Sequence, residues 1–132
     1  MDTLKVGMKH TLKWTVTEDL TTSRGDYQVF STPSMTRFVE MASHYLVLPH
    51  LQPGQGQVGV VVNIRHMAPT PIGKEVRAEV ELTGIDRRML TFKIDVFDDV
   101  EQIGAATHDR FVVDLDKYMA KLKAKLGEPA AN

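Results

Sequence analysis

The sequence predicts an α+β domain in which a long antiparallel sheet wraps around one central helix. Three observations lead to this prediction. The chain has 132 residues, which suits a single core. One segment carries apolar residues at helical spacing, and it is followed by a run of alternating strands joined by short turns. We expect one domain over residues 1–126 and a disordered tail at 127–132, where nothing is available to bury.

The one apolar helix is predicted from Ser34 to Leu48. Thr32 followed by Pro33 is typical of a helix start, with the threonine hydroxyl at the N-cap and the proline where its missing N–H costs nothing. The prolines and glycine at 49, 53 and 54 end the helix. Its apolar stripe consists of Met35, Phe38, Val39, Ala42 and Leu46.

The strands are predicted from alternating polarity and from valine-rich runs. Before the helix they are His10–Thr17 and the short apolar run Tyr27–Phe30; after it they are Gln57–His66, Glu75–Ile85, Met89–Phe97 and Gln102–Leu115, followed by a lysine-rich helix at 116–126. Strands joined by short turns pair as antiparallel neighbours. Only one apolar helix can cover such a sheet, so the sheet must wrap it, an arrangement called the hot-dog fold. Its strand edges suggest a homodimer paired edge to edge.

Composition narrows the class of function. Sixteen basic and 17 acidic residues leave a net charge of −1, so neither a nucleic acid nor a membrane is an expected partner. The absence of cysteine excludes disulfides and a thiolate nucleophile. The histidines form no metal-binding motif and no glycine-rich phosphate loop follows a strand, so no metal or other cofactor is expected. The first ten residues do not resemble a signal peptide, and a cytoplasmic location is expected.

Three polar residues could carry chemistry, and each also has a purely structural interpretation. Glu40 lies roughly 140° from Met35 on a helical wheel, where a solvated glutamate is the common case. His66 ends the valine-rich strand beside a proline loop, which suits a functional residue but also a structural histidine. Thr32 needs no chemical role as an N-cap. Gly59 is more informative, because glycine weakens a strand unless a backbone or ligand must approach closely.

Taken together, these residues resemble the fluoroacetyl-CoA thioesterase type of hot-dog protein, over most of the chain from about Leu4 to Lys125. The matching segments are Phe30–Met35, Val39–Ala42, Val58–His66, Ala68–Gly73 and Ile103–Arg110. The resemblance implies an acyl-CoA thioester hydrolase in which Thr32, Glu40 and His66 form the catalytic set. It also implies that Gly59 lies close to the thioester and that Arg110 lines the site.

Two departures from the family pattern bear on the substrate. Pro33 stands where the fluoroacetyl enzyme has glycine, and the stretch Arg24–Tyr27 lacks the phenylalanine of that enzyme's lid. We therefore expect hydrolysis of a short or medium acyl-CoA without a sharp preference for the fluoroacetyl group.

Several alternatives stay open at this level. A non-catalytic acyl-CoA or small-ligand binding protein could use the same fold, although a binder would not need all three polar residues together. A hydratase is disfavoured because the sequence lacks an Asp-x-Asn-x-x-His segment. In a hydrolase, Glu40 could act as a general base or as a nucleophile through an anhydride. Thr32 would hold the carboxylate or the thioester, and His66 would position water or protonate the thiolate.

Overall fold

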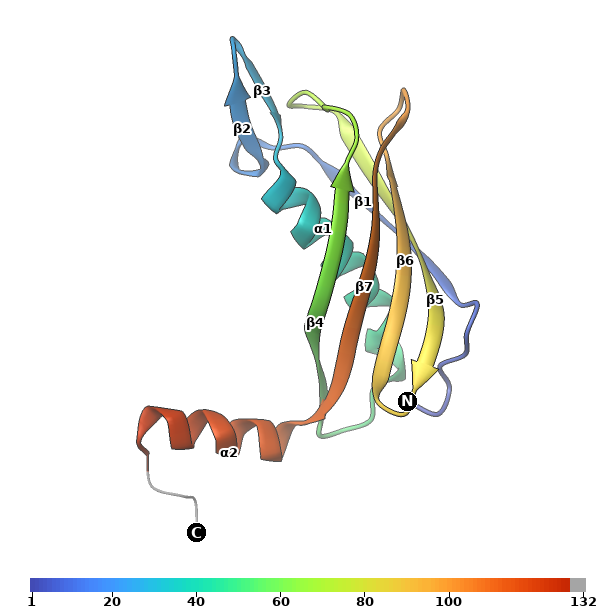
Figure 1. Ribbon diagram of the computed structural model, residues 1–132, viewed down its shortest axis with the longest axis vertical. Helices are drawn as coiled ribbons and strands as arrows, with labels where there is room; N and C mark the ends of the chain where they lie inside the picture. The colour runs from blue at the N-terminus through green and yellow to red at the C-terminus, as the bar shows by residue number, and fades with distance from the viewer. Residues whose placement is uncertain (129–132) are drawn as a thin grey trace.

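In the computed structural model, which describes residues 1–128, a five-stranded antiparallel sheet wraps around helix α1 (Figure 1). This arrangement confirms the predicted fold class. The predicted tail lies outside the described residues from Pro129 onward. In chain order the elements are β1 (Lys9–Thr15), β2 (Thr21–Arg24), β3 (Tyr27–Phe30), α1 (Thr32–Val47), β4 (Gln55–His66), β5 (Glu75–Asp86), β6 (Met89–Phe97), β7 (Gln102–Asp114) and α2 (Leu115–Leu126), with 3-10 turns at Glu18–Leu20 and Leu48–His50.

The strand order in the sheet is β1-β5-β6-β7-β4. The neighbours β5, β6 and β7 are consecutive in sequence and antiparallel, as predicted. The two edge strands come from other parts of the chain: β1 pairs with β5, and β4 pairs with β7. Within residues 1–128, β4 has a partner on one side only, so the strand that carries Gly59 and His66 forms an open edge of the sheet.

Helix α1 fills the concave face of the sheet. Its predicted apolar stripe is buried throughout, from Met35 to Leu46. Phe38 packs against Trp14 of β1 with ring centroids 4.6 Å apart, and Phe30 meets Phe38 edge-on at 6.1 Å. Because a helix of this length is marginal by itself in water, this buried stripe supplies most of its stability. The packing also holds the helix against β4, where the candidate site residues lie.

The start of α1 differs from the prediction. Ser31 is the N-cap, and its Oγ accepts a hydrogen bond from the backbone N–H of Ser34 at 3.2 Å. Thr32 is the first helical residue, so the prediction that Thr32 caps the helix is wrong. Ser31 and Thr32 both carry a hydroxyl and both come before Pro33. Ser31 is the cap because its backbone is extended (φ −83, ψ 155), as an N-cap requires, whereas Thr32 is already helical. The Thr32 hydroxyl is therefore available for another contact.

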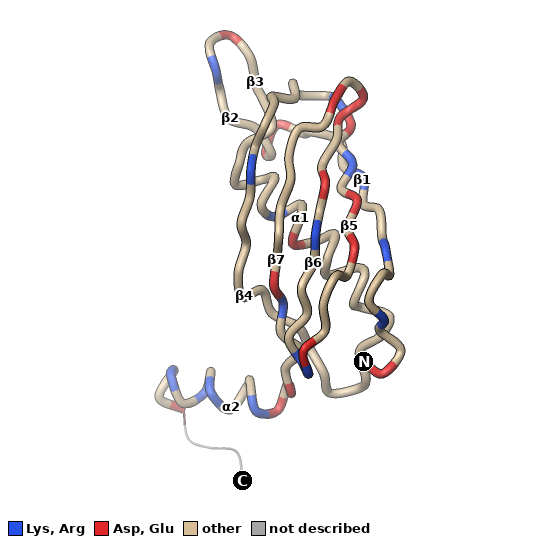
Figure 2. Tube along the Cα trace, turned by 45° about the vertical axis from the view of Figure 1, so that its right-hand side comes forward, with Lys and Arg blue, Asp and Glu red and all other residues tan. Residues whose placement is uncertain are grey.

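Two elements stand away from the sheet. The hairpin β2–β3 turns at Gly25 and Asp26 and rises at the end of the sheet where β4 finishes (Figure 1). The sequence predicted β3 but not β2, whose four residues are polar. Helix α2 lies at the opposite end and projects beyond β4 (Figures 1 and 2). None of the described helices is long and apolar enough to cross a bilayer.

Candidate functional site

The side chains of Thr32 and His66 form a pair at the upper end of β4. Oγ1 of Thr32 lies 2.8 Å from Nδ1 of His66, within hydrogen-bond distance. The first turn of α1 positions the threonine, and the last residue of β4 positions the histidine. The ring of Phe30 meets the imidazole edge-on at 6.5 Å and limits its rotation. The structure thus joins two of the three predicted catalytic residues.

The imidazole of His66 is set up to act as a neutral ring. Burial lowers the pKa of His66 below its ordinary value of 6.5, and the nearby backbone of Ala68 acts in the opposite direction. When the Thr32 hydroxyl donates to Nδ1, the single proton of the neutral ring lies on Nε2. Nε2 is buried and has no hydrogen-bond partner within residues 1–128. A buried polar atom of this kind is costly, and a reacting group would satisfy it.

A hollow of about 310 Å³ opens beside this pair. Its size falls at the lower end of small-molecule sites. The hairpin contributes polar walls through Thr22 and Arg24 and apolar ones through Val29 and Phe30. The remaining lining residues are Ser31, Thr32, His66, Met67, Ala68 and Pro69.

Glu40 lies in a second cluster, near the middle of β4. Its Oε2 is 3.9 Å from Nη1 of Arg110, and a Cβ on Gly59 would come within 3.0 Å of the same oxygen. A side chain at position 59 would therefore push the carboxylate away. The pairing of β4 with β7 also shifts by one residue between Gly59 and Val61. Such bulges occur often beside functional sites, where they redirect the chain. The close approach expected at Gly59 is made by the Glu40 carboxylate.

Arg110 is held rigidly beneath the carboxylate. Its side chain is only 7% exposed, whereas that of Glu40 is 39% exposed. The Nε of Arg110 donates to Oε1 of Gln57 at 2.8 Å, and Nη1 lies 3.2 Å from Nε2 of His108. Burial lowers the pKa of Arg110 and the nearby Glu40 carboxylate raises it, but a guanidinium starts so high that it stays charged. Glu40 thus faces a fixed positive charge.

His108 contacts Arg110 and helps to orient the guanidinium. It is almost completely buried, and its Nδ1 lies 2.7 Å from the carbonyl oxygen of Val61. A carbonyl only accepts, so Nδ1 carries the proton and Nε2 accepts from Arg110. Burial is the largest cause that lowers the pKa of His108, and the Arg110 charge adds to it. Sequence reasoning missed this residue, although the two-residue period of a strand places His108 and Arg110 on one face.

Within one chain these two clusters do not meet. Eight helical residues separate Thr32 from Glu40, a rise of about 12 Å. Seven strand residues separate Gly59 from His66, about 23 Å along β4. The structure therefore brings together Thr32 with His66, and Glu40 with Gly59 and Arg110. In the part of the chain that is described, no group of three His, Asp or Glu side chains is placed to hold a metal ion.

Comparison with known proteins identifies the relatives of this chain. The family model described as fluoroacetyl-CoA-specific thioesterase matches residues 8–116. The fluoroacetyl-CoA thioesterase of Streptantibioticus cattleyicolor is 36% identical over 98 residues, which cover 74% of this chain and 70% of that protein. The crystal structure of the fluoroacetyl-CoA thioesterase FlK is similar with a TM-score of 0.86 at 31% identity, covering 92% of this chain and 97% of that one. FlK mutants have been studied in complex with fluoroacetate and CoA, and with acetyl-CoA.

A more distant structure supports the fold alone. It is a hypothetical protein of Thermus thermophilus from the thioesterase superfamily, with a TM-score of 0.89 at 20% identity over 96% of both chains. The wrapped sheet, its central helix and these neighbours define a hot-dog fold. The chain belongs, more particularly, to the fluoroacetyl-CoA-specific thioesterase family, as the sequence resemblance implied.

Proposed function

We propose that this protein hydrolyses a short or medium acyl-CoA to the free acid and coenzyme A. The observation that carries the proposal is the Glu40 carboxylate, which lies against Gly59 and beside the buried Arg110 in a chain of this family. A merely solvated glutamate would need neither a glycine opposite it nor a buried cation fixed by two further side chains. A cytoplasmic location belongs to the same proposal, because acyl-CoA thioesters are made and used inside the cell.

In this reaction Glu40 activates the attack on the thioester carbonyl. In one route it takes a proton from water, the water oxygen attacks the carbonyl, and the C–S bond breaks. In the other route the carboxylate attacks the carbonyl itself, the C–S bond breaks to give an anhydride, and water then opens the anhydride to the free acid and the Glu40 carboxylate. Gly59 leaves room for the thioester beside the carboxylate, and the buried Arg110 orients that carboxylate. The thiolate finally takes up the proton that water gives up in the hydrolysis. Nε2–H of His66, in a ring held by the Thr32 hydroxyl, is proposed to donate a hydrogen bond to the departing sulfur while the ring stays neutral.

A homodimer completes the proposed site. The open edge of β4 is free to pair with β4 of a second copy, antiparallel about a two-fold axis. A pairing that sets Gly59 opposite His66 of the second copy would bring Glu40 of one copy to the Thr32–His66 pair of the other. This arrangement removes the separation of about 23 Å that divides the clusters within one chain.

A panel of acyl-CoA thioesters assayed by thiol release tests the activity. The protein contains no cysteine, so a thiol reagent has no background from it. Glu40→Gln should lower turnover by about 10² or more while the fold survives, since general-base contributions are typically 10²–10⁴. Glu81→Gln, an exposed glutamate of β5, is the matched control and should leave turnover unchanged.

Three results would count against the proposal. Near-normal turnover of a folded Glu40→Gln variant would show that Glu40 is a solvated surface residue with no role in catalysis. Tight binding of acyl-CoA without thiol release would favour the non-catalytic binding protein. A stable monomer at micromolar concentration in light scattering would remove the composite site.

A further inference from the structure

We propose that helix α2 is an arm that packs on a second copy of this chain, against the segment 67–72 that follows its β4. The proposal rests on the homodimer of the proposed function and adds to it a contact that the sheet edges alone do not make. Three observations carry it: the fixed direction of α2, its partly uncovered apolar face, and an exposed apolar segment at the place this face would reach.

The direction of α2 is fixed where it leaves the sheet. The backbone N–H of Leu115 donates to the carbonyl of Gly54 at 2.9 Å, and Asp114 caps the helix by accepting from the N–H of Asp116. A Cβ on Gly56 would lie only 2.8 Å from Cδ2 of Leu115, so this glycine allows the first turn to sit directly on β4. From there the helix runs outward past β4, the open edge of the sheet (Figures 1 and 2).

One face of α2 is apolar and only partly covered by the chain's own sheet. Leu115, Tyr118, Met119, Leu122 and Leu126 fall within about 100° of a helical wheel. No residue of this helix is buried, and Leu122 and Leu126 are 40% and 74% exposed. The helix is otherwise rich in lysine (Figure 2). Amphipathic helices of globular proteins cover their apolar face, so this one lacks its counterpart in a single chain.

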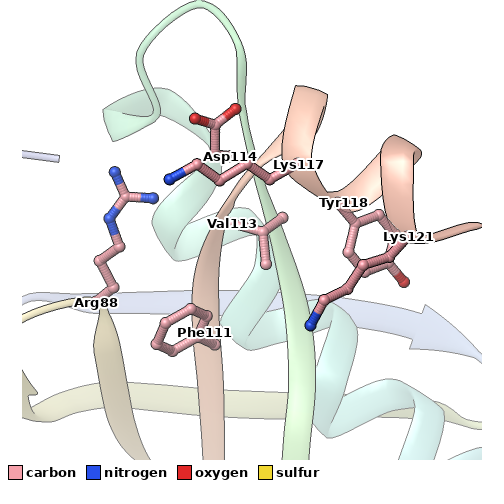
Figure 3. Close-up of a pocket in the computed structure, with 7 residues that line it drawn as sticks. All are labelled: Arg88, Phe111, Val113, Asp114, Lys117, Tyr118 and Lys121. Atoms are coloured by element: carbon pink, nitrogen blue, oxygen red, sulfur yellow. The ribbon is translucent and has the colours of Figure 1, made fainter. Parts of the chain in front are cut away.

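The first half of that face lies over the chain's own sheet. Figure 3 shows Tyr118 and Lys121 of α2 beside Phe111 and Val113 of β7, around a shallow hollow. The second half, with Leu122 and Leu126, lies farther along the helix and has no buried contact. It is this outer half that projects beyond the edge strand and would meet a second copy.

The geometry of edge pairing indicates that a second copy of this chain covers the outer half of the apolar face of α2. With Gly59 opposite His66 of the second copy, Gly56 lies opposite Pro69 of that copy. The segment there exposes two large apolar side chains, Met67 at 50% and Ile72 at 43%. Each α2 would thus reach the second copy's segment 67–72.

The apolar face of α2 and the segment 67–72 of the second copy also lie on the same side of the paired sheets. The side chain of His66 faces α1 through Thr32, so alternation points Met67 to the outer side. Val112 is buried beneath α1, which places Val113 on the outer side. Leu115 starts α2 beside Val113, since both approach the Cβ position of Gly56.

This contact would support the site of the other copy. The first three residues of the segment 67–72 are Met67, Ala68 and Pro69, and all three line the hollow next to Thr32 and His66. An arm that presses on this segment would hold one wall of the second copy's hollow. Helix α2 is in this sense a positioning element and not part of the catalytic set.

Cysteine cross-linking tests the contact directly, because the chain has no cysteine of its own. We would mix one preparation carrying Leu122→Cys with another carrying Met67→Cys and oxidise the mixture. The expected product is a covalent mixed dimer on a non-reducing gel. Ala124→Cys mixed with Met67→Cys is the matched control, since Ala124 lies on the opposite face of the same helix and should give little product.

A second measurement does not depend on disulfide formation. Replacing Leu122 and Leu126 together by glutamate should raise the dimer dissociation constant at least tenfold in sedimentation equilibrium, whereas Ala124→Glu should leave it unchanged. A wild-type dimer that gives no mixed cross-link overturns the arm but leaves the sheet-paired dimer and the thioesterase assay standing. A wild-type monomer overturns the arm as well. Binding of α2 to vesicles of phosphatidylserine and phosphatidylcholine, without the mixed cross-link, would assign the apolar face to a membrane and also overturn it.

Discussion

Oγ1 of Thr32 and Nδ1 of His66 lie 2.8 Å apart, although 34 positions separate the two residues in the chain. The contact depends on Ser31, which caps α1 and so releases the neighbouring threonine from that task. It also leaves Nε2 as the buried ring atom without a hydrogen-bond partner in residues 1–128. The Ser31 hydroxyl caps the helix and the Thr32 hydroxyl contacts His66, and these separate roles lead to the first prediction.

Thr32→Ala should lower turnover with little change in stability, because the helix keeps its cap. Ser31→Ala should leave turnover largely unchanged but lower the free energy of unfolding by about 1 kcal/mol, the usual cost of a lost cap. We expect the Thr32 variant to lose at least about tenfold in kcat, equivalent to one hydrogen bond of about 1.4 kcal/mol in the transition state. Thr32→Ser, which keeps the hydroxyl, should retain most of the activity.

Urea denaturation and thiol-release kinetics on the three variants make this measurement. If the activity of Thr32→Ala and Ser31→Ala fell in proportion to their stability, both hydroxyls would be scaffold and the catalytic role of Thr32 would be wrong.

Gly59→Ala should displace the Glu40 carboxylate, since the added Cβ would lie 3.0 Å from Oε2. We expect kcat to fall by about tenfold or more, because small misplacements of a reacting group cost up to about 10². Gly84→Ala in β5 is the matched control, since its Cβ would find its nearest neighbour at an ordinary 3.5 Å.

A double variant identifies the cause. In a Glu40→Gln background the further loss from Gly59→Ala should be much smaller than in the wild type, because residues in contact are not additive. Equal losses in both backgrounds would show that Gly59 acts on the sheet and not through the carboxylate.

Acid should destabilise the protein through three histidines, of which His108 is buried and His44 and His66 are half-buried. Burial is the largest cause that lowers the pKa of His44, His66 and His108 below the ordinary value of 6.5. Below this pH the unfolded chain therefore binds more protons than the folded chain, and the free energy of unfolding falls as the pH decreases. We expect little histidine-dependent change above about pH 7.5 and a steady loss toward about pH 5.5.

Denaturant titrations at several pH values, with His66→Gln as the comparison, check this dependence. The variant should lose stability less steeply on the acid side than the wild type. Stability that rises from about pH 7.5 to about pH 5.5 would contradict the direction of all three pKa shifts.

The β2–β3 hairpin leads to a prediction about substrate selectivity. Its tip, Arg24 to Tyr27, carries no phenylalanine, and Tyr27 is 71% exposed. The walls that the hairpin gives to the hollow are polar at Thr22 and Arg24 and apolar only at the base, at Val29 and Phe30. Polar walls exclude water poorly, and a pocket separates near-isosteres by only about 1–3 kcal/mol. The ratio of kcat/KM for fluoroacetyl-CoA over acetyl-CoA should therefore stay below roughly 10³.

Steady-state kinetics with both thioesters gives this ratio. Tyr27→Ala should change it little, because Tyr27 does not line the hollow. A ratio well above 10³ would mean that the site senses fluorine by a group outside the hairpin.

Local periodicity determined much of this protein. The stripe from Met35 to Leu46 specified α1 and its buried face, and alternation specified β5, β6 and β7 to within a residue or two of their ends. These elements were predictable because each pattern repeats over neighbouring residues and each strand pairs with the next along the chain. A single apolar helix beside so much strand then required the sheet to wrap it.

Only the tertiary structure decided which distant residues meet. The edge positions of β1 and β4, the pairing of polar β2 with β3, and the choice of Ser31 over Thr32 as the cap follow from backbone geometry that no local pattern encodes. The sequence suggested Glu40 and Gly59 separately, but their contact arises because α1 crosses β4 at the bulge. Contacts of this kind depend on how the helix and the strand pack against each other, and the residue type at a single position does not determine that packing.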